Sequence, residues 1–448
     1  MSDYWHTNGE REILFRMGQA VIPPGKVFPP FTREPVLRGE VIAGSLPPAV
    51  RQAVRAIIWA IELGSIPRYR KRMSALDLDR RIEYLRTWSQ GNAIRRAAFR
   101  YVTLPQKVFY YDDPDKFKAL GIEYAKPPVQ DDSPRWMSNV TAGKDIHDPL
   151  DLETEVVVVG TGAGGAAAAC ALAEQGDAVL MVEEGDYHRR SAFNGRPFEM
   201  QKLMYRGVGG ISTTVGNTPI LLPTGRCVGG TTTINSGTCF RTPERTLDRW
   251  RGQHGLTEYT LEAMEPYFAR VEAEYRVERA DMKVVGKLGE IMARGADRLG
   301  YSHRPLDRCA PDCDGQGVCT YGCPTGAKRS TDVSYVPRAL RNNAQLLTGV
   351  RVEGLLVKNG RAVGVRGVSR ATGVAVTIRA RVVVLAMGTL MTPLFLRRQG
   401  VGNSSGRLGR NVSIHTAGGV VALMDEVVDG FKSIPQGYLV DQFAAQGL

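Results

Sequence analysis

The hydrophobic pattern centres on a β-branched run, Val156 to Val159, that leads directly into a glycine-rich turn. A short, continuous apolar run predicts a strand that is buried on both faces, and it is too short to cross a membrane. An alanine-rich helix is predicted to about Gln175, with Gly176 suited to its C-terminal cap. Ala178 to Val182 predicts the next parallel strand. This order of strand, helix and strand indicates an α/β fold.

The N-terminal third has a different pattern. Residues 1–40 hold five prolines whose spacing predicts an extended arm. Pro47 and Pro48 mark a helix start, and apolar residues at helical spacing then predict a helical extension. Its first two helices carry Val54, Ile57, Ile58 and Ile61, and then Leu78, Ile82 and Leu85. The polar, proline-rich stretch 126–149 predicts a linker into the β-branched strand.

The chain after the β-branched strand mixes helical and strand patterns. Residues 256–277 and 287–300 predict helices, the second with an apolar face of Leu288, Ile291, Met292 and Leu299. Residues 346–385 alternate as strands do, with turns at Gly360 and Gly373.

The glycine-rich turn supplies candidate chemistry. Gly160, Gly162 and Gly165 fill a G-x-G-x-x-G pattern, and Ala163 lies inside it. The first glycine makes the turn, the second lets backbone N–H groups approach a pyrophosphate, and the third lets helix and strand pack closely. Glu183 ends the second strand, where a carboxylate accepts hydrogen bonds from a ribose 2'-hydroxyl. The unit predicts a dinucleotide site, without distinguishing FAD from NAD.

A second glycine-rich segment, Gly225 to Pro243, reads GRCVGGTTTINSGTCFRTP. Its glycines and small hydroxyl residues are typical of a loop that contacts a phosphate or the edge of a flavin ring. The composition alone is equally typical of a surface loop.

The positive charge of the chain is concentrated in one stretch. The 448 residues carry a net charge of +12, and residues 51–100 hold 12 Lys and Arg against 4 Asp and Glu. We interpret this stretch as a solvated helical surface, and contact with anionic lipid at the membrane periphery stays open. The arginines form no nucleic-acid-binding motif, so no nucleic-acid partner is predicted. The N-terminus lacks the pattern of a signal peptide, which favours a cytoplasmic protein.

Three segments now carry a family resemblance: the nucleotide unit that ends in LMVEEG, GRCVGGTTTINSGTCF, and VVVLAMGTLMTPLFLRRQG. Together they resemble the glucose-methanol-choline (GMC) family of FAD-dependent oxidoreductases. Within it the chain looks most like bacterial long-chain alcohol oxidases and dehydrogenases, which share a helical N-terminal extension and a GxCxxGCPTGAK-like stretch. The resemblance implies a Rossmann-like FAD-binding domain, an α+β substrate domain and the N-terminal helical extension.

The resemblance also implies site residues. Ile234 stands where some relatives carry the histidine that bonds covalently to FAD, so we expect non-covalent FAD. Val352 matches the residue whose backbone contacts adenine, and Gly388 closes the strand under the flavin. The residues that match the second flavin-contact segment are Gly229, Gly230, Thr231 and Asn235.

The chain has seven cysteines, an odd number, so they cannot all pair with one another. Four of them lie close together in the sequence: Cys309, Cys313, Cys319 and Cys323. Cys313, Cys319 and Cys323 are spaced similarly to the iron-sulfur ligands of cytochrome-linked FAD sugar dehydrogenases. We favour free thiols or one disulfide over an iron-sulfur cluster, and a cluster over zinc, so no metal ligand is predicted. The remaining three, Cys170, Cys227 and Cys239, are interpreted as small buried apolar residues.

The resemblance implies oxidation of an alcohol by hydride transfer to flavin N5, with oxygen or an electron carrier as the acceptor. In the family a histidine takes the hydroxyl proton, and it lies in a C-terminal segment with no counterpart before Leu448. We therefore name no catalytic base, expect His415 to have an ordering role, and expect a C-terminally truncated chain with exposed apolar surface. An inactive flavin-binding module and a cytochrome- or quinone-coupled dehydrogenase with an iron-sulfur centre are the alternatives.

Six segments are expected. They are a proline-rich arm (1–40), the helical extension and linker (41–150), the FAD-binding domain in two parts (151–245 and 331–412), a substrate or cap segment with the cysteine-rich loop (246–330), and the start of a substrate-domain sheet (413–448).

Overall fold

The computed structural model describes residues 5–25, 28–122, 134–209, 220–415 and 417–444. The chain divides into two compact units, Met1–Glu123 and Tyr124–Leu448. Each unit is described by itself below.

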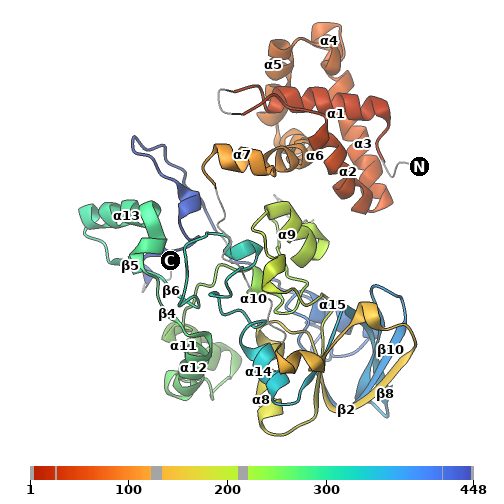
Figure 1. Cartoon of the computed structure of the whole chain (residues 1–448), viewed down its shortest axis with the longest axis vertical. Helices are drawn as coiled ribbons and strands as arrows, with labels where there is room; N and C mark the ends of the chain where they lie inside the picture. The colour runs from red at the N-terminus through yellow and green to blue at the C-terminus, as the bar shows by residue number, and fades with distance from the viewer. Residues whose placement is uncertain (1–4, 26–27, 123–133, 210–219, 416, 445–448) are drawn as a thin grey trace. The chain divides into compact units, whose positions relative to one another are not determined.

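The first unit is helical, and its helices are red to orange in Figure 1. They are α1 (Asn8–Val21), α2 (Glu34–Ser45), α3 (Pro48–Leu63), α4 (Ile66–Tyr69), α5 (Leu78–Ser89), α6 (Ala93–Tyr111) and α7 (Pro114–Ala119).

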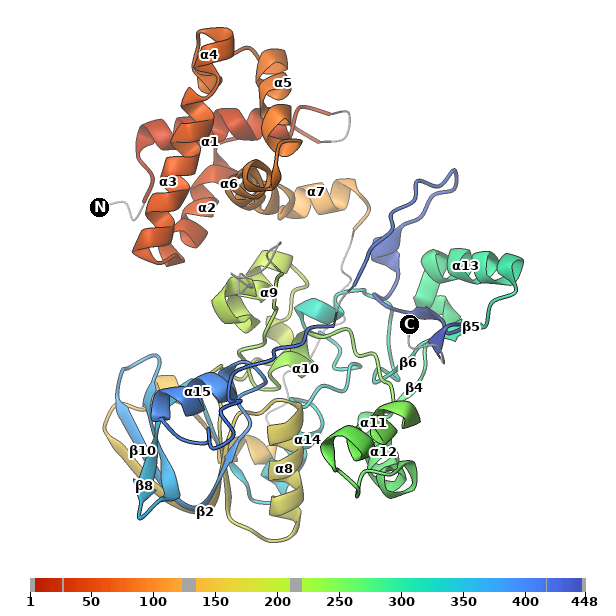
Figure 2. The ribbon, with the colours of Figure 1, turned by 180° about the vertical axis from the view of Figure 1, so that it is seen from behind.

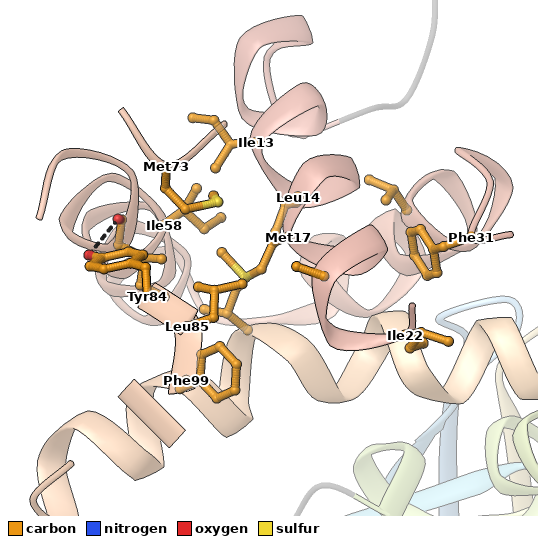
Figure 3. Packing of buried hydrophobic residues seen from close by; sticks show 14 of the residues in the cluster. Ile13, Leu14, Met17, Ile22, Phe31, Ile58, Met73, Tyr84, Leu85 and Phe99 are labelled. Atoms are coloured by element: carbon orange, nitrogen blue, oxygen red, sulfur yellow. Dashed lines mark hydrogen bonds between the residues drawn. The ribbon is translucent and has the colours of Figure 1, made fainter. Parts of the chain in front are cut away.

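One hydrophobic core joins these helices (Figure 3). Met17 of α1 and Ile58 of α3 are completely buried in it, and Leu85 of α5 packs against them. Tyr84 is buried beside Leu85, and its hydroxyl donates to Ile61 O over 2.9 Å. The predicted apolar face of α3 is therefore confirmed, whereas in α5 Leu85 is buried, Ile82 is partly buried and Leu78 is exposed.

The prediction of an extended arm over 1–40 is wrong. Helix α1 occupies Asn8–Val21, which contains no proline. The Thr7 hydroxyl accepts from Glu10 N over 3.2 Å, and Thr7 N donates to the Glu10 carboxylate over 2.9 Å, forming a capping box. The prolines fall after this helix, and the last of them, Pro35, lies in the first turn of α2, where a helix tolerates it.

The second unit is built on a seven-stranded sheet in the order β1-β7-β3-β2-β10-β9-β8. The first five strands in this order run parallel, and β9 and β8 add an antiparallel meander to β10. The strands are β1 (Val140–Ala142), β2 (Leu150–Val159), β3 (Val179–Val182), β7 (Gln345–Thr348), β8 (Val350–Lys358), β9 (Arg361–Ser369) and β10 (Ala375–Leu385).

Alternate residues of the sheet face two different cores. Val156 and Val158 of β2 pack with α8 (Ala163–Glu174) and α14 (Tyr335–Arg341), which lie side by side in Figures 1 and 2. Val157 and Val159 face the opposite way, into a core that includes Phe395 of α15 (Met391–Gln399). The predicted strand, buried on both faces, is confirmed, as are the helix and the second strand that follow it.

The predicted linker over 126–149 needs a correction, because its described part belongs to the second unit. Strand β1 pairs parallel with β7 at one edge of the sheet, with Thr141 opposite Leu347. The Asn139 side chain also donates to Leu340 O over 2.9 Å. Three residues are too few for the alternation pattern that reveals a strand.

Smaller elements complete the second unit. Two short antiparallel pairs, β4 with β6 and β5 with β11, lie outside the main sheet. The elements are α9 (Pro197–Met204), α10 (Thr231–Ile234), α11 (Glu244–His254), α12 (Leu261–Tyr275), α13 (Met282–Leu299), β4 (Glu278–Arg279), β5 (His303–Pro305), β6 (Asp307–Arg308) and β11 (Tyr438–Val440).

The predicted apolar face of α13 is not its buried face. The helix begins at Met282 and bends at Gly286, where φ is +69°. Its buried residues are Val285, Gly289 and Ala296. Leu288, Met292 and Leu299 are exposed instead.

The C-terminal stretch also exposes apolar side chains, as expected. Val420 is 97% exposed, and Val421, Leu423 and Val427 are similarly open. Among the described residues of 413–448, the only strand is β11, which pairs with β5, so the expected substrate-domain sheet is represented by this pair. Among the helices of the described ranges, none is both long and apolar enough to span a bilayer.

Candidate functional site

The glycine turn between β2 and α8 is closed by backbone contacts. At Gly160 φ is +106°, and an added Cβ would lie 2.4 Å from Ala386 O, just after β10. At Gly165 an added Cβ would lie 2.0 Å from Gly160 O. The first and third glycines thus have the predicted structural roles, because any side chain would separate helix, turn and strand.

The middle of the turn is open. An added Cβ at Gly162 or Gly164 would meet no atom within 4 Å. Gly162 is the N-cap of α8, and within the described residues no side chain caps this helix. Its first N–H groups are therefore available for an anion, which the positive end of the helix dipole favours.

The second glycine-rich segment packs directly on the first. Gly230 has φ of +51°, and its added Cβ would lie 3.1 Å from Gly162 Cα. The neighbouring Gly229 N donates to Thr161 Oγ1 over 3.2 Å. Thr331 also donates through Oγ1 to Thr161 O over 2.8 Å. The two segments are 68 residues apart in sequence, yet they form one continuous backbone surface.

Glu183 is buried at the end of β3 and holds this turn. Its Oε2 accepts from Thr161 N over 3.0 Å and from Thr161 Oγ1 over 2.7 Å, while Oε1 accepts from Gly185 N over 2.9 Å. Burial raises the pKa of the Glu183 carboxyl, and these donors oppose that rise. A carboxylate accepts about four hydrogen bonds, so one acceptor position remains for the predicted ribose contact.

A buried lysine fixes the end of the second segment. Lys328 is 1% exposed, and its Nζ donates to Thr233 O over 2.8 Å, Asn235 O over 2.6 Å and Cys319 O over 2.8 Å. Burial lowers the pKa of its ammonium group. The same stretch holds Asp332, which accepts from Thr233 Oγ1 over 3.3 Å and pairs with Arg190.

The other predicted cofactor residues lie around this surface. Ala163 is the first residue of α8. Thr231 begins α10, and its Oγ1 accepts from Gly225 N over 3.2 Å. Asn235 is the C-cap residue that follows α10. Ile234 is buried in a cluster with Phe193 and Met204. Their contacts with FAD stay predictions.

Val352 and Gly388 are related to the glycine turn and Glu183 through residues two positions before them. Val352 is buried on β8, two residues after Val350, whose N–H donates to Glu183 O over 3.0 Å. Gly388 follows β10 with φ of +89°, two residues after Ala386, which contacts the glycine turn.

Three residues of this site were missed from the sequence: Thr161, Lys328 and Thr331. Thr161 occupies the variable position between Gly160 and Gly162, so the motif gives no signal for it. Lys328 ends the quoted cysteine-rich stretch, but two of its three partners lie more than 90 residues away. Only the fold reveals these partners.

The cysteines are all free thiols. In the part of the chain that the structure describes, no three His, Cys, Asp or Glu side chains converge as metal ligands. The arrangement gives no support to an iron-sulfur centre at Cys313, Cys319 and Cys323. Cys239 is not the isolated buried residue expected, because it is half-buried and contacts Cys309.

This site fits the pyrophosphate part of a dinucleotide. It combines an open turn, free N–H groups at a helix N-terminus and a second backbone segment held against the first. It also lies at the carboxyl end of β2, between β3 and β10, where open α/β sheets bind ligands.

The comparisons with known proteins agree with this geometry. Residues 155–195 match the family model for an FAD binding domain, and residues 200–417 match the model for GMC oxidoreductase. An uncharacterized GMC-type oxidoreductase of Mycobacterium tuberculosis is 34% identical over 273 residues, which cover 61% of this chain and 43% of the relative. A long-chain-alcohol oxidase of Arabidopsis thaliana is 31% identical over 255 residues, covering 54% of this chain and 33% of the oxidase.

A solved structure of Aspergillus oryzae formate oxidase aligns at 19% identity with a TM-score of 0.45, covering 59% of this chain and 51% of that chain. A structural similarity at this level supports no assignment of function. The matched stretches span about 43% of the mycobacterial relative and 33% of the plant oxidase.

Proposed function

The chain belongs to the GMC oxidoreductase family, and we propose that it binds FAD non-covalently and oxidises a primary alcohol to the aldehyde. FAD supplies the acceptor for the hydride, at its N5 position. The residues of this chain bind the dinucleotide and position it. No residue is assigned as the base that takes the hydroxyl proton.

The observation that carries the proposal is the contact between the two glycine-rich segments. Gly229 donates to Thr161, and Gly230 packs on Gly162 at the open turn of α8. A pyrophosphate at this turn is met by N–H groups of the helix terminus and by the backbone of the second segment. Glu183 orders the turn and offers its remaining lone pair to the ribose.

A long-chain alcohol is the substrate class that we propose. Its support is the 31% identity to a long-chain-alcohol oxidase, together with the cysteine-rich stretch that the resemblance includes. The acceptor of the electrons is oxygen or an electron carrier. Residues that would enclose the alkyl chain are not assigned.

FAD titration of the purified chain, followed by turnover assays with primary alcohols of increasing length, tests the proposal. Saturable FAD binding with turnover that rises with chain length supports it in full. If the chain binds FAD but turns over no alcohol, it acts as a flavin-binding module and not as an enzyme. A folded chain that binds no FAD would overturn the proposal.

A further inference from the structure

Two cysteines from separate loops share one face of a short antiparallel pairing. Thr238 lies opposite Arg308 in an isolated bridge. Cys239 N donates to Asp307 O over 2.9 Å, and Cys309 N donates to Gly237 O over 2.9 Å. Because side chains alternate along a strand, Cys239 and Cys309 both point to the face opposite Thr238 and Arg308.

Both sulfurs lie over Gly237. An added Cβ at Gly237 would lie 3.4 Å from Cys309 Sγ, and Cys239 Sγ is 3.8 Å from Gly237 O. Gly237 has φ of +75°, so its missing side chain leaves the space that the two sulfurs use. The Cys239 thiol donates to Gly237 O, and the Cys239 and Cys309 side chains shift each other's pKa in opposite directions.

Two buried cations act on Cys309: Lys328, whose side chain lies beside it over Gly237, and Arg308, on the opposite face of the pairing. Arg308 is 2% exposed, and its guanidinium donates to Ser236 O and, over 3.3 Å, to Cys319 Sγ. Its Nε and Nη1 have no hydrogen-bond partner among the described residues. The hydrogen bond from Cys239 lowers the pKa of Cys309 to about 7, and the charges of Lys328 and Arg308 act in the same direction.

We propose that Cys239 and Cys309 form an oxidisable dithiol, which hydrogen peroxide converts to a disulfide beside the second glycine-rich segment. The Cys309 thiolate attacks one peroxide oxygen, the O–O bond breaks, and the released hydroxide takes a proton to become water. Cys239 sulfur then attacks the sulfenic sulfur of Cys309, losing its proton as a second water leaves. The two thiols lose two electrons, and the peroxide gains them.

Three of the other cysteines are disfavoured as sites of oxidation by their pKa. Burial raises the pKa of the Cys170 thiol to about 12 and also raises that of Cys227. Burial likewise raises the pKa of Cys313. Since the thiolate is the form that attacks peroxide, these cysteines react more slowly than Cys309.

The test uses the purified chain, treated with a small molar excess of hydrogen peroxide, then alkylated under denaturing conditions and mapped by peptide mass spectrometry. The expected product is a peptide pair linked through Cys239 and Cys309, two hydrogen atoms lighter than the reduced pair, and reversible by a reductant. In C239S the expected product is a sulfenic acid on Cys309 that dimedone traps. In C309S no sulfenic acid forms at Cys239.

C170S is the matched control, and it should give the same linked peptide as the native chain. Circular dichroism checks that each variant is folded. If C309S does not fold, the native and C239S proteins still decide the matter. A disulfide confined to Cys313, Cys319 and Cys323, or a Cys239–Cys309 pair that stays reduced while other cysteines oxidise, would overturn the proposal.

Discussion

The backbone N–H of Gly229 donates a hydrogen bond to Thr161 Oγ1 over 3.2 Å, joining the two glycine-rich segments. The same hydroxyl donates to the Glu183 carboxylate over 2.7 Å. One side chain therefore links the turn after β2, the acid after β3 and the second segment. The proposed dinucleotide site depends on this link.

Thr161→Val removes the link and keeps the shape of the side chain. It leaves Gly229 N–H without its acceptor and removes one of the two donors to Glu183 Oε2, so we expect FAD affinity to fall by roughly 1 to 2 kcal/mol, about 5- to 30-fold. Quenching of flavin fluorescence measures the affinity. Thr154→Val is the control, because Thr154 Oγ1 donates to Ala178 O at an exposed site away from the turn. If Thr161→Val and Thr154→Val bind FAD with equal affinity, the Thr161 side chain does not contribute to FAD binding.

Gly230→Ala tests the close packing of the segments. Its Cβ would enter at 3.1 Å from Gly162 Cα, in a backbone conformation with φ of +51° that alanine rarely adopts. FAD affinity should fall at least tenfold. Gly360→Ala is matched for backbone strain, with φ of +76° in the turn between β8 and β9, but its Cβ meets nothing within 4 Å. If Gly360→Ala lowers FAD affinity as much, general destabilisation rather than the site explains the loss.

Lys328→Met should destabilise the second unit. The variant leaves two buried carbonyl oxygens and one partly buried one without their shared donor, so we expect a loss of roughly 2 to 4 kcal/mol in the free energy of unfolding. Urea denaturation measures this loss, and FAD titration below the transition should show weaker binding. Lys358→Met, at an exposed position of β8, should change neither quantity. Unfolding curves that coincide for the two variants would contradict the role of Lys328.

Alkylation of Cys309 should depend on pH near neutrality. Its pKa is lowered to about 7 from 9.0, mainly by the hydrogen bond from Cys239, and Lys328 and Arg308 add their positive charge. The native chain binds this proton more weakly than the unfolded chain, so the resulting stability is present above pH 9 and is lost as the pH falls through about 7. Iodoacetamide labelling of Cys309 should rise through about pH 7, and Cys239→Ala, which removes the donor, should move the midpoint upward. An unchanged midpoint would show that Cys239 does not lower the pKa.

The exposed apolar residues of the C-terminal stretch predict association. Val420 and Leu423 are almost fully exposed, so this chain should self-associate as its concentration rises. Light scattering after size-exclusion chromatography measures the mass. The double variant Val420→Ser and Leu423→Ser should remain monomeric at higher concentration, whereas Thr154→Val should behave as the parent. A monomeric parent would contradict this expectation.

The sequence predicted the β2-α8-β3 unit because each of its signals is local. The β-branched run, the three glycines and the terminal acid Glu183 lie within 28 residues of one another. Helix α3 could be predicted equally well, because its apolar spacing matches its buried face, while the predicted helix α5 buries Tyr84 and Leu85 rather than Leu78. These are the cases in which local pattern and tertiary packing agree.

The rest depended on contacts between distant segments. Strand β1 is visible only through its pairing with β7, and the buried face of α13 is set by its neighbours rather than by its most apolar residues. The pairing of Cys239 with Cys309 depends on a bridge between residues 70 positions apart. In the N-terminal region, the prediction of an extended arm relied on the proline content and overlooked the capping box that starts α1, so it was wrong.

The absorbance spectrum of the purified chain, recorded again on the supernatant after acid precipitation, tests the central claim most directly. The account predicts the two visible bands of oxidised flavin, released in full into the supernatant, and their loss in Gly230→Ala but not in Gly360→Ala. Flavin that stays in the precipitate would contradict non-covalent binding. A folded chain that carries no flavin and takes up none when FAD is added would contradict the site itself.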